Sequence, residues 1–161
     1  MSRFKDLNTG MNEILTKITA NQDICKLLYY NFEDALSRPD IEDTSILLAE
    51  ESKLIYTDFY IPTTETIPKS YLITYLDNFR LDRSNIEFKE GILTFIVLTH
   101  MSLYQVDGGK RLYAIINEID EIFNETRITG FGKLFIDSCR ITRANENISG
   151  YTVGYSLYNK N

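Results

Sequence analysis

The residue with the widest chemical scope is His100, the single histidine among 161 residues. An imidazole can act as a general base, activate a serine or cysteine, or bind a metal. His100 stands inside an apolar run, ILTFIVLTHMSLY, with no second histidine or cysteine near it in sequence to complete a metal site. An enzyme would need His100 in a pocket beside a carboxylate. We instead expect His100 to be a satisfied residue of a sheet, and we expect no catalytic residue, metal ligand or cofactor.

Three further patterns resemble chemical motifs but have simpler explanations. The stretch Asp107–Lys110, DGGK, could hold an anion with backbone N–H groups. It lacks the spacing of a phosphate loop, however, and Asp107 would repel phosphate, so helix capping explains it better. The acidic residues Glu118, Asp120 and Glu121 fit the solvated face of a helix. The stretch 130–132, GFG, fits a turn before a strand.

Composition places the chain among ordinary globular proteins. It carries 23 acidic and 17 basic residues, a formal net charge of -6, which argues against a nucleic-acid interface built from basic residues. An acidic wall around a DNA channel stays compatible with this charge. Cys25 and Cys139 lack a CxxC partner and are expected to be buried or half-buried free thiols in a reducing compartment. We expect no signal peptide and no membrane span, so the protein should stay in a cytoplasm-like compartment.

The most regular block runs from Ile92 to Phe123. Residues 92–104 are apolar on both alternating faces, which predicts a strand at the centre of a sheet. After the Asp-Gly-Gly break the period becomes helical, and one face of the predicted helix carries Leu112, Ile115, Ile116, Ile119 and Phe123. A buried strand followed by an amphipathic helix indicates an α+β domain.

The remaining elements complete a prediction of order α-α-(α)-β-β-α-β-β. Thr9 is a candidate cap for a first helix and Asn21 for a second that ends at 37–39, and a short third helix would start at 43 or 44 and fade near 53. Strands are predicted over 71–79, 133–142 and 151–158, and Gly91 is expected at a bulge or tight turn. The prediction is one domain of α+β class over 1–161, with a helical part at 1–53, an extended arm at 54–69, and a sheet plus helix at 70–161. The sheet should be antiparallel or mixed, with about four strands and one long amphipathic helix packed on it.

The arm allows two interpretations. Its prolines, Pro62 and Pro68, preclude a long regular element, yet its aromatic residues are too apolar for a solvated loop. It could be a strap folded over its own core, or an arm that lies on another subunit. In the second case Tyr56, Phe59 and Tyr60 are the expected anchors between subunits.

Five segments together resemble the neck and tail proteins of tailed bacteriophages, in particular the tail terminator or tail-to-head joining group. They are YLITYLDNFR at 71–80, ILTFIVLTH at 92–100, DGGKRLYAIINEIDEIFN at 107–124, and GFGKLFIDSCRI with SGYTVGYSLY in the final hairpin. The resemblance covers about residues 70–158 by pattern.

The resemblance implies a structural virion protein without enzymatic activity, assembled in the host cytoplasm. It would form a ring, typically a homo-hexamer, that caps the tail tube and joins it to the head connector. The sheet would approach the central channel, through which DNA passes without specific binding. Arg80, Asp82 and Arg83 at a hairpin tip would be candidates for contact with the tail tube or connector, although an ordinary solvated turn explains them equally well. Two alternatives stay open: another phage part, such as a head-completion, adaptor or minor capsid protein, and a monomeric binding module such as an inhibitor or immunity-type protein.

Overall fold

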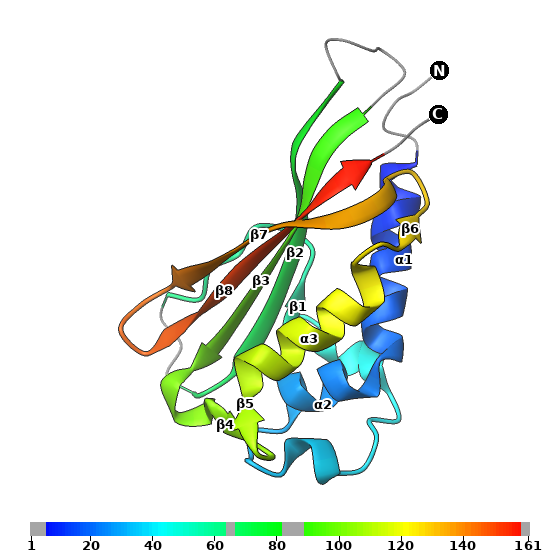
Figure 1. Ribbon diagram of the computed structural model, residues 1–161. Helices are drawn as coiled ribbons and strands as arrows, with labels where there is room; N and C mark the ends of the chain where they lie inside the picture. Colours follow the sequence, from blue (N-terminus) through cyan, green and yellow to red (C-terminus); the bar gives the residue numbers. More distant parts are fainter. Residues whose placement is uncertain (1–5, 64–66, 82–88, 159–161) are drawn as a thin grey trace.

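The computed structural model describes residues 6–63, 67–81 and 89–158. Their fold is α+β, as the sequence predicts, with helices covering one face of a twisted sheet (Figure 1). The helices are α1 (Leu7–Ala20), α2 (Gln22–Tyr29) and α3 (Arg111–Phe123), with 3-10 turns η1 (Ala35–Ser37), η2 (Thr44–Leu47) and η3 (Met101–Leu103). The strands are β1 (Ile55–Tyr56), β2 (Ser70–Leu81), β3 (Lys89–His100), β4 (Gln105–Val106), β5 (Gly109–Lys110), β6 (Arg127–Ile128), β7 (Gly132–Arg143) and β8 (Ile148–Tyr158).

The main sheet is mixed and has the strand order β1-β2-β3-β8-β7-β6. The four long strands correspond to the four that the sequence predicts, and the two-residue strands β1 and β6 extend the sheet at its ends. Only β1 runs parallel to its neighbour β2, while the other pairs are antiparallel. β3 lies between β2 and β8, which confirms its predicted central position.

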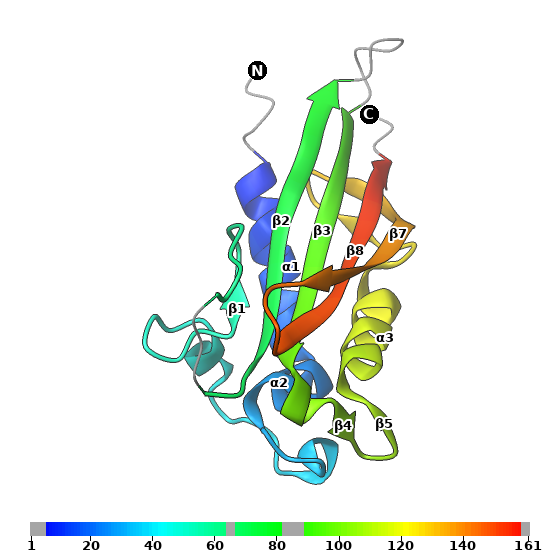
Figure 2. The same ribbon diagram turned by 90° about the vertical axis from the view of Figure 1, so that its left-hand side faces the viewer.

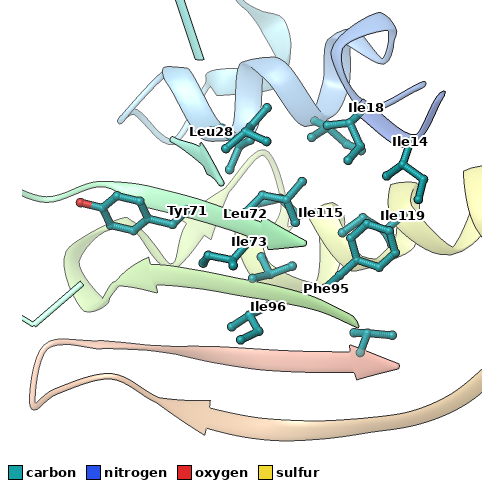
Figure 3. Close-up of a cluster of buried hydrophobic side chains, with 14 of the residues drawn as sticks. Ile14, Ile18, Leu28, Tyr71, Leu72, Ile73, Phe95, Ile96, Ile115 and Ile119 are labelled. Atoms are coloured by element: carbon teal, nitrogen blue, oxygen red, sulfur yellow. The ribbon is translucent and has the colours of Figure 1, made fainter. Parts of the chain in front are cut away.

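The hydrophobic core lies between the sheet and the helices. Phe95 of β3 and Phe123 of α3 stack with ring centroids 5.0 Å apart. Figure 3 shows side chains from all three helices meeting the strands, among them Ile14, Ile18, Leu28, Ile115 and Ile119. The predicted apolar face of α3 is confirmed, because Ile115, Ile119 and Phe123 are fully buried.

The N-terminal helices start and stop at different residues from those expected. α1 begins at Leu7 with Asp6 as its cap, rather than at Thr9. Asn21 does cap α2, since its Oδ1 accepts a hydrogen bond from the Ile24 N–H at 2.9 Å. α2 ends at Tyr29, well before the predicted end at 37–39, and the chain then forms the separate turn η1.

The predicted third helix is the single turn η2. Asp43 caps it, because its carboxylate accepts a hydrogen bond from the Ser45 N–H at 3.0 Å. The chain then folds back, and the Leu54 N–H donates to the carbonyl of Leu47 at 2.9 Å. This return contact replaces the helix that was expected to continue towards residue 53.

Two details of β3 depart from or refine the prediction. The strand ends at His100 rather than at residue 104, because the His100 side chain accepts from the Ser102 N–H and caps η3. At the other end, the register with β2 shifts between Asp77 and Arg80, so two β2 residues stand opposite Gly91. Gly91 therefore lies at a bulge, as expected, and a Cβ there would meet Leu157 at 2.9 Å. Among the described helices, none combines the length and the apolar character needed to cross a membrane.

Candidate interaction surface

The arm, residues 54–63, folds over its own sheet on the face opposite the helices. The rings of Tyr56 and Tyr60 stack with centroids 4.1 Å apart, and each lies 6.3 Å from the ring of Tyr71 in β2. Ile73 and Ile96 on this face are buried. The sheet is therefore apolar on both sides, and the arm covers the side that the helices leave open.

The three predicted anchors of the arm differ in how much surface they offer. Tyr56 and Tyr60 are half-buried by their contacts within the chain. Phe59 is 64% exposed and touches the sheet only edge-on, with its ring centroid 5.6 Å from that of Tyr75. Asp58 beside it is exposed as well. Of the three residues, Phe59 is the one with most of its side chain available to a partner.

The predicted hairpin contact is placed only in part. Arg80 is exposed near the end of β2, and its Nε donates to the Glu90 carboxylate across the strand pair at 2.8 Å. Asp82 and Arg83 lie outside the described residues. Arg80 thus has a local partner, as an ordinary solvated ion pair would.

β7 offers a surface that the sequence reasoning did not single out. Residues 137–141 of this strand are all exposed, with Ile141 76% exposed. β6 pairs only with Gly132 and Lys133, so the rest of β7 has no neighbouring strand on that side within the described residues. Figure 1 shows the β7–β8 hairpin projecting from the body of the molecule. An exposed strand edge of this kind can pair with another chain.

A pocket of about 280 Å³ lies beside this edge, between β7, β8 and the start of α3. We call it the tyrosine pocket, and it is lined by Tyr104, Lys110, Leu112, Tyr113, Ile141, Ser149, Gly150 and Tyr151. The hydroxyls of Tyr113 and Tyr151 are hydrogen-bonded at 3.1 Å, and that of Tyr104 is hydrogen-bonded to Ser149. These bonds fix the rings that form the wall.

The chemistry of the tyrosine pocket suits binding. Its hydrogen bond with Tyr113 raises the pKa of Tyr151 above the ordinary value, so the phenol stays neutral at physiological pH. Lys110 lines the pocket and its side chain is exposed. An apolar floor with hydroxyl and cationic groups at its rim can hold a large apolar side chain that is followed or preceded by an acidic group.

His100, the residue considered for catalysis, makes its hydrogen bonds to the neighbouring turn. The Nδ1 of His100 lies 2.8 Å from the Ser102 hydroxyl, in addition to its contact with the Ser102 N–H. Within residues 6–63, 67–81 and 89–158, no three His, Cys, Asp or Glu side chains gather as a metal site. Both cysteines are free. Cys25 is buried as expected, and its burial raises the pKa of the thiol to about 11, whereas Cys139 is exposed, contrary to the expectation.

Asp107 does not cap α3, which corrects the interpretation of the DGGK stretch. Its carboxylate accepts a hydrogen bond from the Leu36 N–H at 2.9 Å and holds η1 instead. Lys110 occupies the cap position of α3 without a side-chain hydrogen bond there. The Asp107 carboxylate thus connects the loop to η1, and the loop serves the packing of η1 against the start of α3.

The most informative side chain that sequence reasoning missed is Arg111. It is fully buried, and it donates to the carbonyls of Leu103 at 2.8 Å, Leu27 at 2.5 Å, Tyr30 at 2.9 Å and Phe32 at 2.8 Å. A cation at the end of a helix satisfies the last carbonyls and interacts favourably with the helix dipole. Arg111 thereby ends α2 and fixes it to the start of α3, where the tyrosine pocket lies.

Comparison with known proteins gives a family and little else. No curated protein matches the chain. A family model described as YomW matches residues 21–159, from the cap of α2 to beyond the end of β8. That description is a gene name from an SPBeta-like prophage, a coarse indication of phage association. Since the match includes most of the sequence and every long strand, the chain belongs to the YomW family.

Proposed function

We propose that this chain is a non-enzymatic structural part of a phage particle, a neck protein that assembles with copies of itself as a tail terminator ring. The ring would cap the tail tube and join it to the head connector, with DNA passing through it unbound. The phage-associated family name supports the phage setting. The single observation that carries the contact role is the exposed edge of β7, next to a pocket built for an apolar side chain.

The surface is arranged for contact with other proteins. Ile141 and Tyr113, 58% exposed, lie on one side of the hairpin, and Phe59 lies on the other. Large exposed apolar side chains beside an open strand edge are costly on a monomer unless a partner covers them. Self-association covers them, and a symmetric assembly is the usual outcome of self-association.

Light scattering and native mass spectrometry of the full chain test this proposal. The expected result is a defined oligomer at micromolar concentration that reverts to a monomer in an Ile141→Asp variant with an unchanged circular dichroism spectrum. Ile136→Asp, at a second exposed β7 position outside the tyrosine pocket, serves as the comparison variant. A chain that stays monomeric at every concentration, and that mass spectrometry does not find in purified phage particles, would contradict the proposal.

One observation favours a second candidate, a monomeric binding module. The arm folds back over its own sheet, so the chain buries both sheet faces without a partner. A module of this kind would use the β7 edge for a different protein and show no self-association. The same light-scattering measurement separates the two candidates.

A further inference from the structure

Two exposed apolar surfaces face opposite sides of the molecule. One is the arm, with Phe59 at its exposed point, and the other is the tyrosine pocket, with Ile141 and Tyr113 at its rim. Figure 2 shows β1 of the arm on one side of the sheet and α3 with β4 and β5 on the other, with the β7–β8 hairpin between them. The two surfaces of one copy therefore lie on opposite faces of the sheet, and the hairpin tip reaches the arm, where the Asn145 side-chain amide donates to the Pro62 carbonyl at 3.5 Å.

Phe59 has an acidic neighbour, and the tyrosine pocket has a basic residue in its lining. Asp58 is exposed next to Phe59, and Glu51 is exposed on the segment that leads into β1. Lys110 lines the tyrosine pocket, whereas Arg140, which alternates with Ile141 along β7, faces the other side of the sheet, where its charge acts on Tyr75. With a net charge of -6, two copies repel one another in most orientations. An approach that brings the carboxylates of the arm to Lys110 replaces part of that repulsion with attraction.

The size of the tyrosine pocket also limits its occupant. Its volume of about 280 Å³ lies just below the range of roughly 300–1,000 Å³ that holds small-molecule ligands. One aromatic side chain is a suitable occupant, and aromatic residues commonly act as interface anchors in such pockets. Phe59 is the exposed phenylalanine of the arm, and an acidic residue directly precedes it.

We propose that Phe59 of one copy docks in the tyrosine pocket of the next copy, with Asp58 facing Lys110. This inference rests on the self-association proposed above and names the two surfaces that meet. Because different surfaces of the same chain are joined, the contact repeats head to tail. Such a contact builds a ring when the rotation between copies closes, and a filament when it does not.

A cross-linking experiment tests the pairing with a thiol that the chain already has. Cys139 is exposed on β7, two residues from Ile141 of the pocket. Phe59→Cys places a second exposed thiol in the arm, while the buried Cys25 reacts slowly because of its raised pKa. A short bis-maleimide should then convert most of the Phe59→Cys protein into a ladder of covalent dimers and higher oligomers on a denaturing gel.

Two controls show whether a ladder is specific. Phe32→Cys carries a thiol at a similarly exposed phenylalanine outside both surfaces and should give at least five-fold less cross-linked product. Adding Cys139→Ser to Phe59→Cys should remove the ladder. Independently, Asp58→Lys should weaken association about ten-fold, and adding Lys110→Glu should restore it.

The outcomes separate this inference from the proposed function. Oligomers that persist without a specific ladder, or with equal ladders from Phe59→Cys and Phe32→Cys, would overturn the docking of Phe59 and leave self-association standing. Monomers at every concentration, again without a ladder, would overturn both. A specific ladder together with charge-reversal rescue supports both.

Discussion

The guanidinium of Arg111 joins α2 to α3 from inside the protein. It reaches four backbone carbonyls, which lie between Leu27 and Phe32 and at Leu103. Burial lowers the pKa of Arg111 below its usual value, and the charge of Asp107 opposes this effect. The group nevertheless stays protonated, because an arginine pKa starts far above neutral pH. Stability depends strongly on such a group, because removing a buried, fully hydrogen-bonded charge or one of its partners is costly.

Replacing this arginine should destabilise the fold. Arg111→Met leaves four carbonyls without their donor, and we expect a loss of about 3 kcal/mol in the free energy of unfolding. Arg111→Lys keeps the charge but has one nitrogen, so it should lose nearly as much. Urea denaturation measures both variants, with the exposed Arg140→Met as the control, expected within about 0.5 kcal/mol of the wild type. Equal midpoints for all three would show that the buried network contributes little.

At position 150 the neighbouring backbone leaves no room for a side chain, so the residue must be glycine. It lies opposite Leu98 in the β3–β8 pair, and a Cβ there would stand 1.7 Å from the carbonyl oxygen of Val97. Gly150→Ala should push the strands apart and lower the melting temperature by about 10 °C, a loss of about 3 kcal/mol. Gly154→Ala is the matched control, because its Cβ would meet only the side chains of Ser138 and Ile92, at 3.0 and 3.1 Å. Calorimetry gives the melting temperature of both variants. A Gly150→Ala protein as stable as the control would contradict this account.

The two thiols should differ in reactivity. At pH 8 a thiol reagent should modify one cysteine per folded chain, Cys139, and both cysteines once the chain is unfolded. Because burial raises the pKa of Cys25 to about 11, the folded state favours the neutral thiol. The stability from this effect is fully present below the unfolded pKa near 9 and is lost as the pH rises towards 11. Two fast-reacting thiols in the folded protein would refute the burial of Cys25.

At the scale of the element, the arm has two parts with different tasks. Tyr60 stacks on Tyr56 and contacts Tyr71, so it belongs to the cover of the sheet. Phe59 contributes little to that cover, because it touches Tyr75 only edge-on. A variant that removes both residues would therefore confuse loss of folding with loss of association.

Single substitutions in the arm should separate these tasks. Tyr60→Ala should cost about 2–3 kcal/mol of stability, because it removes a stacked ring from an apolar face. Phe59→Ala should change stability by less than about 1 kcal/mol and should act on oligomer formation instead. Urea denaturation and light scattering on both proteins check this. If Phe59→Ala unfolds as readily as Tyr60→Ala, the residue belongs to the cover as well.

Elements with a strong period could be predicted from the sequence, and those set by distant contacts could not. The alternating and helical patterns of 92–123 predict β3 and α3, since both depend on which side chains reach the core. The end of α2 depends on Arg111, which follows it by more than 80 residues, and no local signal carries that information. The two-residue strands β1 and β6 exist only by pairing, so their sequences show no pattern of their own.

The candidate site was predictable to a smaller extent than the fold. The sequence predicts Tyr56, Phe59 and Tyr60 as a group, because the arm is too apolar for a solvated loop, and it does not distinguish Phe59 from the other two. The edge of β7 was missed because its exposure depends on the shortness of β6, the preceding strand, which pairs with only two β7 residues and has no sequence pattern of its own. The tyrosine pocket draws its walls from η3, α3 and the final hairpin, which sequence alone does not bring together.

At the scale of the whole molecule, the charge pattern gives association a dependence on salt. The proposed contact sets Asp58 against Lys110, while the remaining charges of two copies repel. The Debye length falls from about 10 Å at 0.1 M salt to about 3 Å at 1 M, so added salt weakens both effects. The close contact includes an apolar anchor that salt does not screen.

Sedimentation at increasing salt should therefore distinguish the wild type from Asp58→Asn. Association of the wild type should weaken by less than about ten-fold between roughly 0.1 M and 1 M salt, because the long-range repulsion is screened as well. Association of Asp58→Asn should hardly weaken over the same range. Equal salt dependence of the two proteins would show that Asp58 takes no part in association.

The order of synthesis gives the arm a further consequence. Residues 54–63 leave the ribosome before β2 and β3. The aromatic residues of the arm are therefore already present when the apolar face of the sheet opposite the helices forms. Each newly made chain can then shield that surface alone, without waiting for another copy to arrive. A chain in which Tyr56 and Tyr60 are both replaced by serine would lose this protection and should form insoluble aggregate.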